Sequence, residues 1–128
     1  MNNVNLKLPD LDETIARLQA YANAGADCLY APGLRTPQQI SAVVTALAPK
    51  PVNLLVGSAS ALTLQTIAAL GVRRISVGGA LARSAWGGFI RAAKMLAEKG
   101  QFDAFADAAP GGELNSFFGA DLGQRGGA

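Results

Sequence analysis

The chain has 128 residues, half of them hydrophobic, and is long enough for one domain with a single modest core. Its 11 basic and 9 acidic residues give a net charge of +2, an excess too small to indicate a nucleic-acid-binding protein. The absence of histidine excludes Ser-His-Asp chemistry and histidine metal ligands, and a single cysteine, Cys28, excludes an internal disulfide bond.

Neither a membrane span nor an export signal is evident in the sequence. No apolar run approaches the length needed to cross a bilayer, and residues 1–5 lack a basic region followed by an apolar stretch. The single cysteine also fits a reducing compartment. We therefore expect a cytoplasmic protein with no membrane partner and no nucleic-acid partner.

The first helix is expected to begin at Asp10 and to end before Gly25. Asp10 can cap the helix, and Glu13 three residues later can complete a capping box. Apolar residues then recur at helical spacing on one face, at Leu11, Ile15, Leu18 and Ala22. A short buried strand over 27–31 follows and ends in a Pro-Gly turn.

The second helix has a complete start signal. Thr36 is a capping residue, Pro37 suits the first helical position, and Gln39 completes a capping box. An apolar stripe follows, and two prolines after residue 48 end the helix. A second buried strand is predicted over 52–56, closed by a glycine.

Three further helices and one more strand are predicted after residue 57. A helix is expected within 58–70, and residues 61–63 are compatible with a very short strand before it. A strand over 74–77 leads into a longer helix over 80–99, and a short helix is expected over 102–109. The Gly-rich residues that follow predict a frayed end.

Strands alternate with helices along the chain, and each strand is nearly continuous in hydrophobic residues. This pattern is typical of an α/β protein with a parallel sheet covered on both faces. A (β/α)8 TIM barrel has about 250 residues, so this chain corresponds to half of such a barrel. We expect a half-barrel over residues 1–102 and a short helix with a Gly-rich tail over 103–128.

Chemistry in α/β folds lies at the carboxyl ends of strands, so the loops there hold the candidate site. Gly78 and Gly79 open the longest helix, where backbone N–H groups can bind an anion; the alternative is a tight turn required by packing. Arg83 lies one turn into that helix and faces either the site or solvent. Arg35, after the first strand, has the same two interpretations.

Asn53 is a polar residue in a buried strand and needs hydrogen-bond partners. It is either a satisfied interior amide or a substrate contact, and alternation places Leu55 and Gly57 on the same side of the strand. Arg73 and Arg74 precede the last strand. They are expected to form a solvated basic rim at the end of the sheet away from the chemistry.

None of the nine carboxylates follows a strand. They fall in the first helix, at the start of the first strand, and in the last helix and tail: Asp10, Asp12, Glu13, Asp27, Glu98, Asp103, Asp107, Glu113 and Asp121. Because an Mg²⁺ site needs one or two convergent carboxylates, the sequence predicts no metal ligand and no catalytic residue in this chain.

Five stretches match a known superfamily in order and spacing. They are residues 12–17 (DETIAR), 24–27 (AGAD), 50–53 (KPVN), 70–78 (LGVRRISVG) and 104–118. Through them the chain resembles the isocitrate lyase/phosphoenolpyruvate mutase superfamily, and in particular bacterial members known as carboxyphosphonoenolpyruvate phosphonomutase or methylisocitrate lyase-like proteins. The resemblance covers about residues 11–118.

The resemblance implies the C-terminal half of an Mg²⁺-dependent barrel enzyme that cleaves or forms C–C or P–C bonds next to a carboxylate. Its members stabilise enolate-like species with a metal and oxyanion groups. In relatives the metal-binding aspartates, a substrate-binding arginine and a mobile catalytic loop lie in the first half of the barrel. This chain corresponds to β/α units 5–8 with the preceding helix, so we expect it to hold no cofactor and to be inactive alone.

The same resemblance assigns site residues. Several relatives have a glutamate at the position of Pro32. Methylisocitrate lyases have an asparagine at the position of Leu55 and a proline at that of Gly78, so the resemblance does not imply methylisocitrate cleavage. Arg83 matches an arginine of the eighth helix. The predicted site for a small carboxylate or phosphonate ligand therefore consists of Asn53, Gly57, Gly78, Gly79 and Arg83.

A half-barrel leaves both sheet edges and its interior side chains without a partner layer. We expect either a homo-oligomer, with two copies paired edge to edge, or a separate N-terminal half that completes the barrel. In the superfamily the eighth helix packs on a neighbouring subunit, which implies that role for helix 80–99. Two alternatives to an enzyme fragment stay open: a non-catalytic truncated paralogue that self-associates or binds a small anion, and an unrelated phosphate-binding half-barrel.

Overall fold

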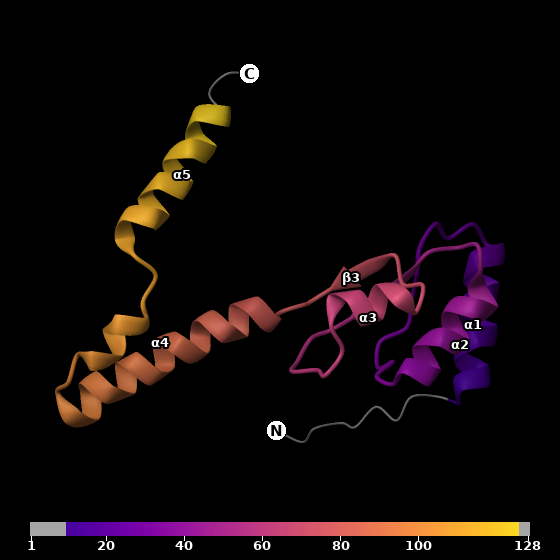
Figure 1. Ribbon diagram of the computed structural model, residues 1–128, viewed down its shortest axis with the longest axis horizontal. Coiled ribbons are helices and arrows are strands. Elements are labelled where there is room, and N and C mark those ends of the chain that lie inside the picture. The colour runs from indigo at the N-terminus through magenta and orange to yellow at the C-terminus, as the bar shows by residue number, and fades with distance from the viewer. Residues whose placement is uncertain (1–9, 126–128) are drawn as a thin grey trace. The chain divides into compact units, whose positions relative to one another are not determined.

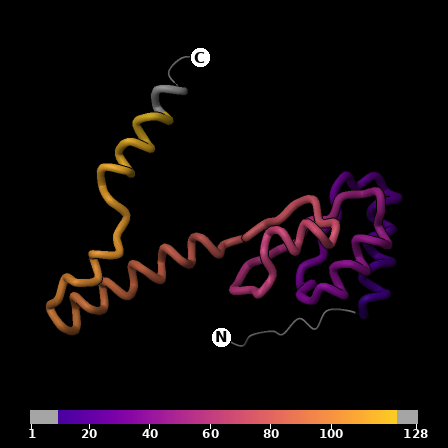
Figure 2. Tube along the Cα trace, in the orientation of Figure 1, coloured from indigo at the N-terminus to yellow at the C-terminus, as the bar shows by residue number. Residues whose placement is uncertain are grey.

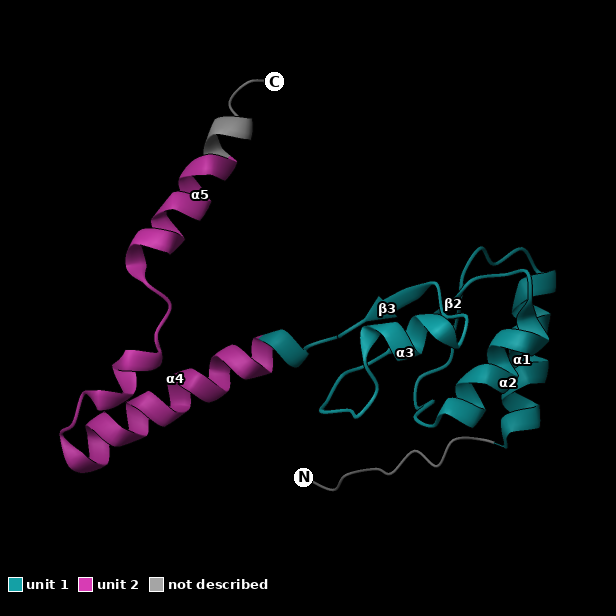
Figure 3. Ribbon diagram, in the orientation of Figure 1, with its two compact units in different colours: residues 1–81 teal, residues 82–128 magenta. Residues whose placement is uncertain are grey.

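The computed structural model describes residues 10–125, which divide into two compact units between Leu81 and Ala82 (Figures 1 and 3). The elements of the first unit are α1 (Leu11–Asn23), β1 (Leu29–Tyr30), α2 (Pro37–Leu47), β2 (Val52–Leu55), α3 (Leu64–Ala69) and β3 (Arg74–Ser76). The second unit contains most of α4 (Ala80–Lys99), the 3-10 helix η1 (Asp103–Asp107) and α5 (Gly111–Arg125). The boundary expected at residue 102 stays a prediction.

The three strands form one parallel sheet in the order β1-β2-β3, and the chain can be followed through it in Figure 2. Leu29 pairs with Val52, and Leu54 pairs with Ile75. Parallel neighbours require a crossover between them, which α2 and α3 provide. The predicted α/β class and the alternation of strands and helices are confirmed.

One face of the sheet packs against the helices and forms the core of the first unit. Leu29, Val52 and Leu54 point to this face. The core cluster consists of Leu18, Leu29, Ala31, Leu34, Ile40, Val43, Leu47, Val52, Leu54, Ile67 and Val72. Since side chains alternate along a strand, the opposite face carries Asn53 and the residues in register with it, Tyr30 and Arg74, both of which are exposed. The expected covering of both faces is therefore not found among the described residues.

Capping residues fix the starts of the first two helices. Thr36 Oγ1 accepts the backbone N–H of Gln39, and Gln39 Oε1 accepts that of Thr36, which confirms the predicted capping box. Asp10 caps α1 as expected. Glu13 forms an ion pair with Arg17 instead of completing the predicted box at Asp10.

The helix expected within 58–70 is shorter, and residues 61–63 form no strand. Thr63 sets the start of α3, because its hydroxyl accepts the backbone N–H of Thr66 while the Thr66 hydroxyl accepts that of Thr63. Before it, Ser60 Oγ accepts a nearby backbone N–H. Such local bonds compete with helical ones and keep this loop outside the helix.

The C-terminal residues are more ordered than the sequence suggests. The short helix expected over 102–109 is present as η1. The sequence did not predict the helix α5, which occupies Gly111–Arg125 of the Gly-rich segment, while the expected frayed end extends to residues 126–128, outside the described residues. The backbone N–H groups of Glu113 and Leu114 both donate to the Pro110 carbonyl, so the proline precedes the first helical turn, and glycines weaken but do not prevent a helix. No helix within residues 10–125 has the length and apolarity needed to span a bilayer.

Candidate functional site

A pocket of about 430 Å³ lies at the carboxyl ends of β1 and β2. It is lined by Gly33, Leu34, Arg35, Leu54, Leu55, Val56, Gly57, Ser58, Ala59, Ser60 and Leu62. A second hollow, of about 600 Å³, lies along α2 and has no strand residue in its lining. Because ligands of parallel α/β folds bind at the carboxyl ends of strands, the first pocket is the candidate site.

Among the described residues that line this pocket, Arg35 alone is charged. Its backbone N–H donates to Gln39 Oε1 over 3.2 Å, so the capping box of α2 also fixes the loop that carries Arg35. A guanidinium presents a planar fork of N–H donors that matches a carboxylate or phosphonate. The sequence-based site omitted Arg35, because a surface arginine was the alternative interpretation; its place in the loop that follows a strand was the available signal.

Two predicted site residues, Gly57 and Gly78, lie against the side chain of Leu55 at the pocket. A Cβ added at Gly57 would lie 3.7 Å from Leu55 Cδ1, and one added at Gly78 would lie 3.4 Å from the same atom. Gly78 also has a φ of +51°, which favours glycine. The structure therefore brings these two glycines together around Leu55, and of the two only Gly57 is in the described pocket lining with Arg35.

Asn53 lies within the sheet, and strand neighbours satisfy its amide. The residue is 2% exposed, its Nδ2 donates to Ser76 Oγ over 3.0 Å, and its Oδ1 accepts from Arg74 Nη1 over 3.1 Å. This arrangement corresponds to the satisfied interior amide. Contact with a substrate stays a prediction for Asn53, and Arg74 turns towards the sheet face rather than lying only on a solvated rim.

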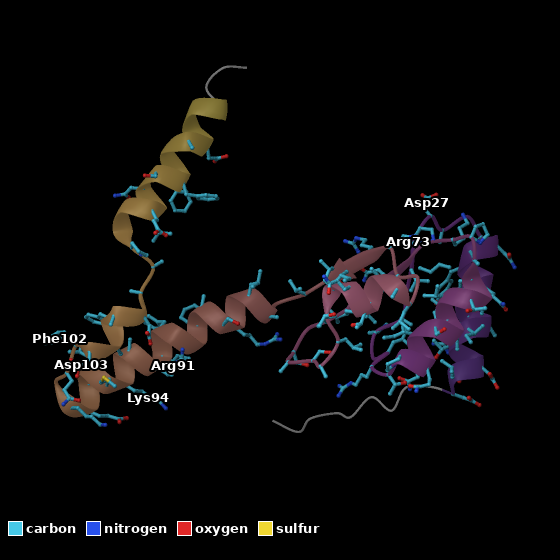
Figure 4. The ribbon with its side chains drawn as sticks, in the orientation of Figure 1. Asp27, Arg73, Arg91, Lys94, Phe102 and Asp103 are labelled. Atoms are coloured by element: carbon cyan, nitrogen blue, oxygen red, sulfur yellow. The ribbon has the colours of Figure 1, made fainter. Side chains whose placement is uncertain are left out.

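Gly79 and Arg83, like Asn53 and Gly78, lie outside the described pocket lining. Gly79 is exposed in the turn before α4. Arg83 lies on α4 and belongs to the second unit. Their roles in ligand binding stay predictions. Arg73 lies at the amino ends of the strands, at the same end as Asp27 (Figure 4), which is where a basic rim away from the site was expected.

The described residues do not fit a magnesium site. Within residues 10–125 there is no group of three or more cysteine, aspartate and glutamate side chains able to hold a metal ion. The described pocket lining contains no carboxylate. Mg²⁺ is held in proteins by carboxylates with water and substrate oxygens, so the pocket cannot bind it unaided.

The parallel strands alternating with helices, with a pocket at their carboxyl ends, match part of a TIM-barrel-type fold, as the solved structures below show. The family model for phosphoenolpyruvate phosphomutase matches residues 4–97. The chain therefore belongs to this family, within the phosphoenolpyruvate mutase/isocitrate lyase superfamily. The resemblance read from the five sequence stretches is confirmed.

Solved structures support the same assignment. A Burkholderia cenocepacia J2315 protein described as a lyase/mutase is 51% identical, with a TM-score of 0.80 over 85% of this chain and 39% of that one. A protein of the same organism described as a phosphonomutase is 42% identical, with a TM-score of 0.57 over 71% of this chain and 34% of that one. Oxaloacetate acetylhydrolase with its product oxalate is 27% identical, with a TM-score of 0.66 over 91% and 42%.

This chain is much shorter than the proteins it matches. It spans about two fifths of the lyase/mutase and of oxaloacetate acetylhydrolase. No curated protein matches it. What these residues contribute to such an activity is therefore inferred below from the pocket.

Proposed function

We propose that this chain is a substrate-binding portion of an enzyme that acts on C–C or P–C bonds of 2-oxo acids or related small carboxylic acids, and that it is inactive alone. The observation that carries the proposal is the strand-end pocket, whose described lining offers a guanidinium and no carboxylate. A site of this composition attracts a small anion but has no acidic group to hold a metal or move a proton.

The chemistry of the pocket suits a carboxylate or phosphonate. Arg35 offers a fork of donors to paired oxygens, and Ser58 and Ser60 add hydroxyl groups to the same lining. Reactions next to a carboxylate build negative charge on substrate oxygens, and preorganised donors stabilise that charge. The complex of oxaloacetate acetylhydrolase with oxalate, a relative's product, supports the choice of a small dianion as ligand.

The proposal includes Mg²⁺ dependence, with the ion held by residues outside those described. The bound ion would supply Lewis-acid polarisation of a substrate oxygen. Since residues 10–125 contain no cluster of metal-binding side chains, the carboxylates that hold it must come from another segment or chain. A cytoplasmic location is also part of the proposal, supported by the single cysteine.

Titration with oxalate tests the pocket. We expect the 128-residue chain to bind oxalate, and Arg35→Ala to raise the dissociation constant about tenfold or more because a charge-assisted contact is lost. Arg17→Ala is the matched control, since Arg17 lies on α1 and pairs with Glu13. Calorimetry with Mg²⁺ and with EDTA should give the same affinity. Equal binding by Arg35→Ala, or binding only with Mg²⁺, would contradict the proposal.

We also propose that the second unit mediates self-association or docking of a complementary N-terminal half. Its described side chains are exposed or half-buried, and none is fully buried. The exposed large hydrophobic residues of this unit are Trp86, Phe89, Ile90, Leu96, Phe102, Phe105, Leu114, Phe117 and Phe118. Exposed apolar surface on this scale is typical of a protein–protein interface, and self-association is the form tested below.

A further inference from the structure

Arg74 stands on the sheet face opposite to the helices. In β3 the neighbouring Ile75 packs against the core on the helical side, so alternation directs Arg74 and Ser76 to the other side. Arg74 is in register with Asn53 of β2, and parallel register partners share a face. Arg73, the preceding residue, lies outside the strand and is exposed.

A hydrogen bond holds the Arg74 guanidinium on this face. Nη1 donates over 3.1 Å to Oδ1 of Asn53, whose Nδ2 is in turn bound to Ser76 Oγ. An arginine at the start of an edge strand could extend into solvent, but Arg74 is hydrogen-bonded to Asn53, a residue that is only 2% exposed. Among the side chains that the structure describes, no aspartate or glutamate forms an ion pair with Arg74.

In a complete barrel this sheet face becomes the interior, which is filled with packed side chains. A guanidinium buried there with a neutral amide as its acceptor would be strongly unfavourable, because a buried charge requires a countercharge. One bond to Asn53 also satisfies only one of the five N–H donors of arginine. The covering layer must therefore provide an acceptor that carries negative charge.

We propose that the strands that close the barrel over this face carry an aspartate or glutamate that forms an ion pair with Arg74. The occupant is the remainder of the family barrel, because the chain matches only 39% of the Burkholderia cenocepacia lyase/mutase and leaves the other strands of that barrel unmatched. Charge complementarity at Arg74 then restricts which strands can pack on this face of the sheet. The interaction is separate from the ligand pocket, whose described lining does not include Arg74.

The test converts the contact into a covalent bond. Arg74→Lys keeps the positive charge and introduces an amine that a carbodiimide joins to a carboxylate in contact. The variant is co-expressed with the part of the Burkholderia cenocepacia lyase/mutase that this chain does not match, and cross-links are located by mass spectrometry. We expect a link from the introduced lysine to an aspartate or glutamate on a strand of that partner. Arg73→Lys, the matched control, should not form it.

Affinity provides a second measurement that does not depend on cross-linking. We expect Arg74→Met to weaken the complex about tenfold or more, and Arg73→Met to change it by less than about twofold. The proposal is overturned if the unmodified chain forms no complex with this partner, or if Arg74→Met binds as tightly as the unmodified chain. It is equally overturned if the introduced lysine links to nothing or only to a second copy of this chain.

Discussion

Replacing Trp86 and Phe89 with serine is expected to convert the 128-residue chain from a self-associated form into a monomer. Trp86, Phe89 and Ile90 lie at helical spacing on one stripe of α4, and the first two are each 62% exposed. Buried aromatic anchors at an interface contribute about 2 kcal/mol or more each, so the loss of two should raise the dissociation constant about a thousandfold. Sedimentation velocity at micromolar concentration measures the change.

Lys94→Ser is the matched control, because Lys94 lies on the polar side of α4 with Arg91 (Figure 4). Its substitution should leave the sedimentation coefficient unchanged. Trp86 is the single tryptophan of the sequence, so its fluorescence should shift to shorter wavelength as the chain associates. A well-folded unmodified chain that sediments as a monomer at these concentrations would contradict the proposed interface.

Leu54→Ala is expected to lower the free energy of unfolding of the first unit by about 2–5 kcal/mol. Leu54 is 2% exposed in the central strand and packs in the cluster formed by the strands and the helices. Its replacement leaves a cavity that the neighbouring side chains cannot fill completely. Urea denaturation followed by far-ultraviolet circular dichroism measures the loss.

Leu64→Ala is the control for this substitution. Leu64 is the same residue type at the start of α3 but is 72% exposed, so its truncation should change the free energy of unfolding by less than about 0.5 kcal/mol. If the two variants were equally stable, the assignment of the core to the helical face of the sheet would be wrong.

Much of the first unit could be predicted from its sequence because its signals are local. The capping box at Thr36 and Gln39 is made by residues three positions apart, and the structure contains both of its hydrogen bonds. Glycines at the predicted helix ends adopt positive φ angles, +103° at Gly25 and +89° at Gly71. A Cβ at Gly71 would also lie 2.7 Å from Val44 Cγ1, so close packing adds to the need for glycine there.

Other features depend on which residues meet in space, and sequence patterns do not specify that. Arg35 follows a strand like many surface arginines, and only the folded loops place it in a pocket with Gly57. Arg74 was expected on a solvated rim, but the register of β2 and β3 aligns it with Asn53. The helix α5 was missed because its glycines suggested a frayed end, while the turn at Pro110 starts it.

Enzyme assay of the 128-residue chain tests the central claim, that these residues shape one side of a ligand site whose metal-binding carboxylates lie elsewhere. Oxaloacetate and phosphonopyruvate are supplied with Mg²⁺, with and without EDTA, and oxaloacetate acetylhydrolase serves as the active reference for the first substrate. We predict no turnover of either substrate by this chain under any of these conditions. Turnover that depends on Mg²⁺ and stops with EDTA would show that this chain alone assembles a metal centre, and would contradict the account.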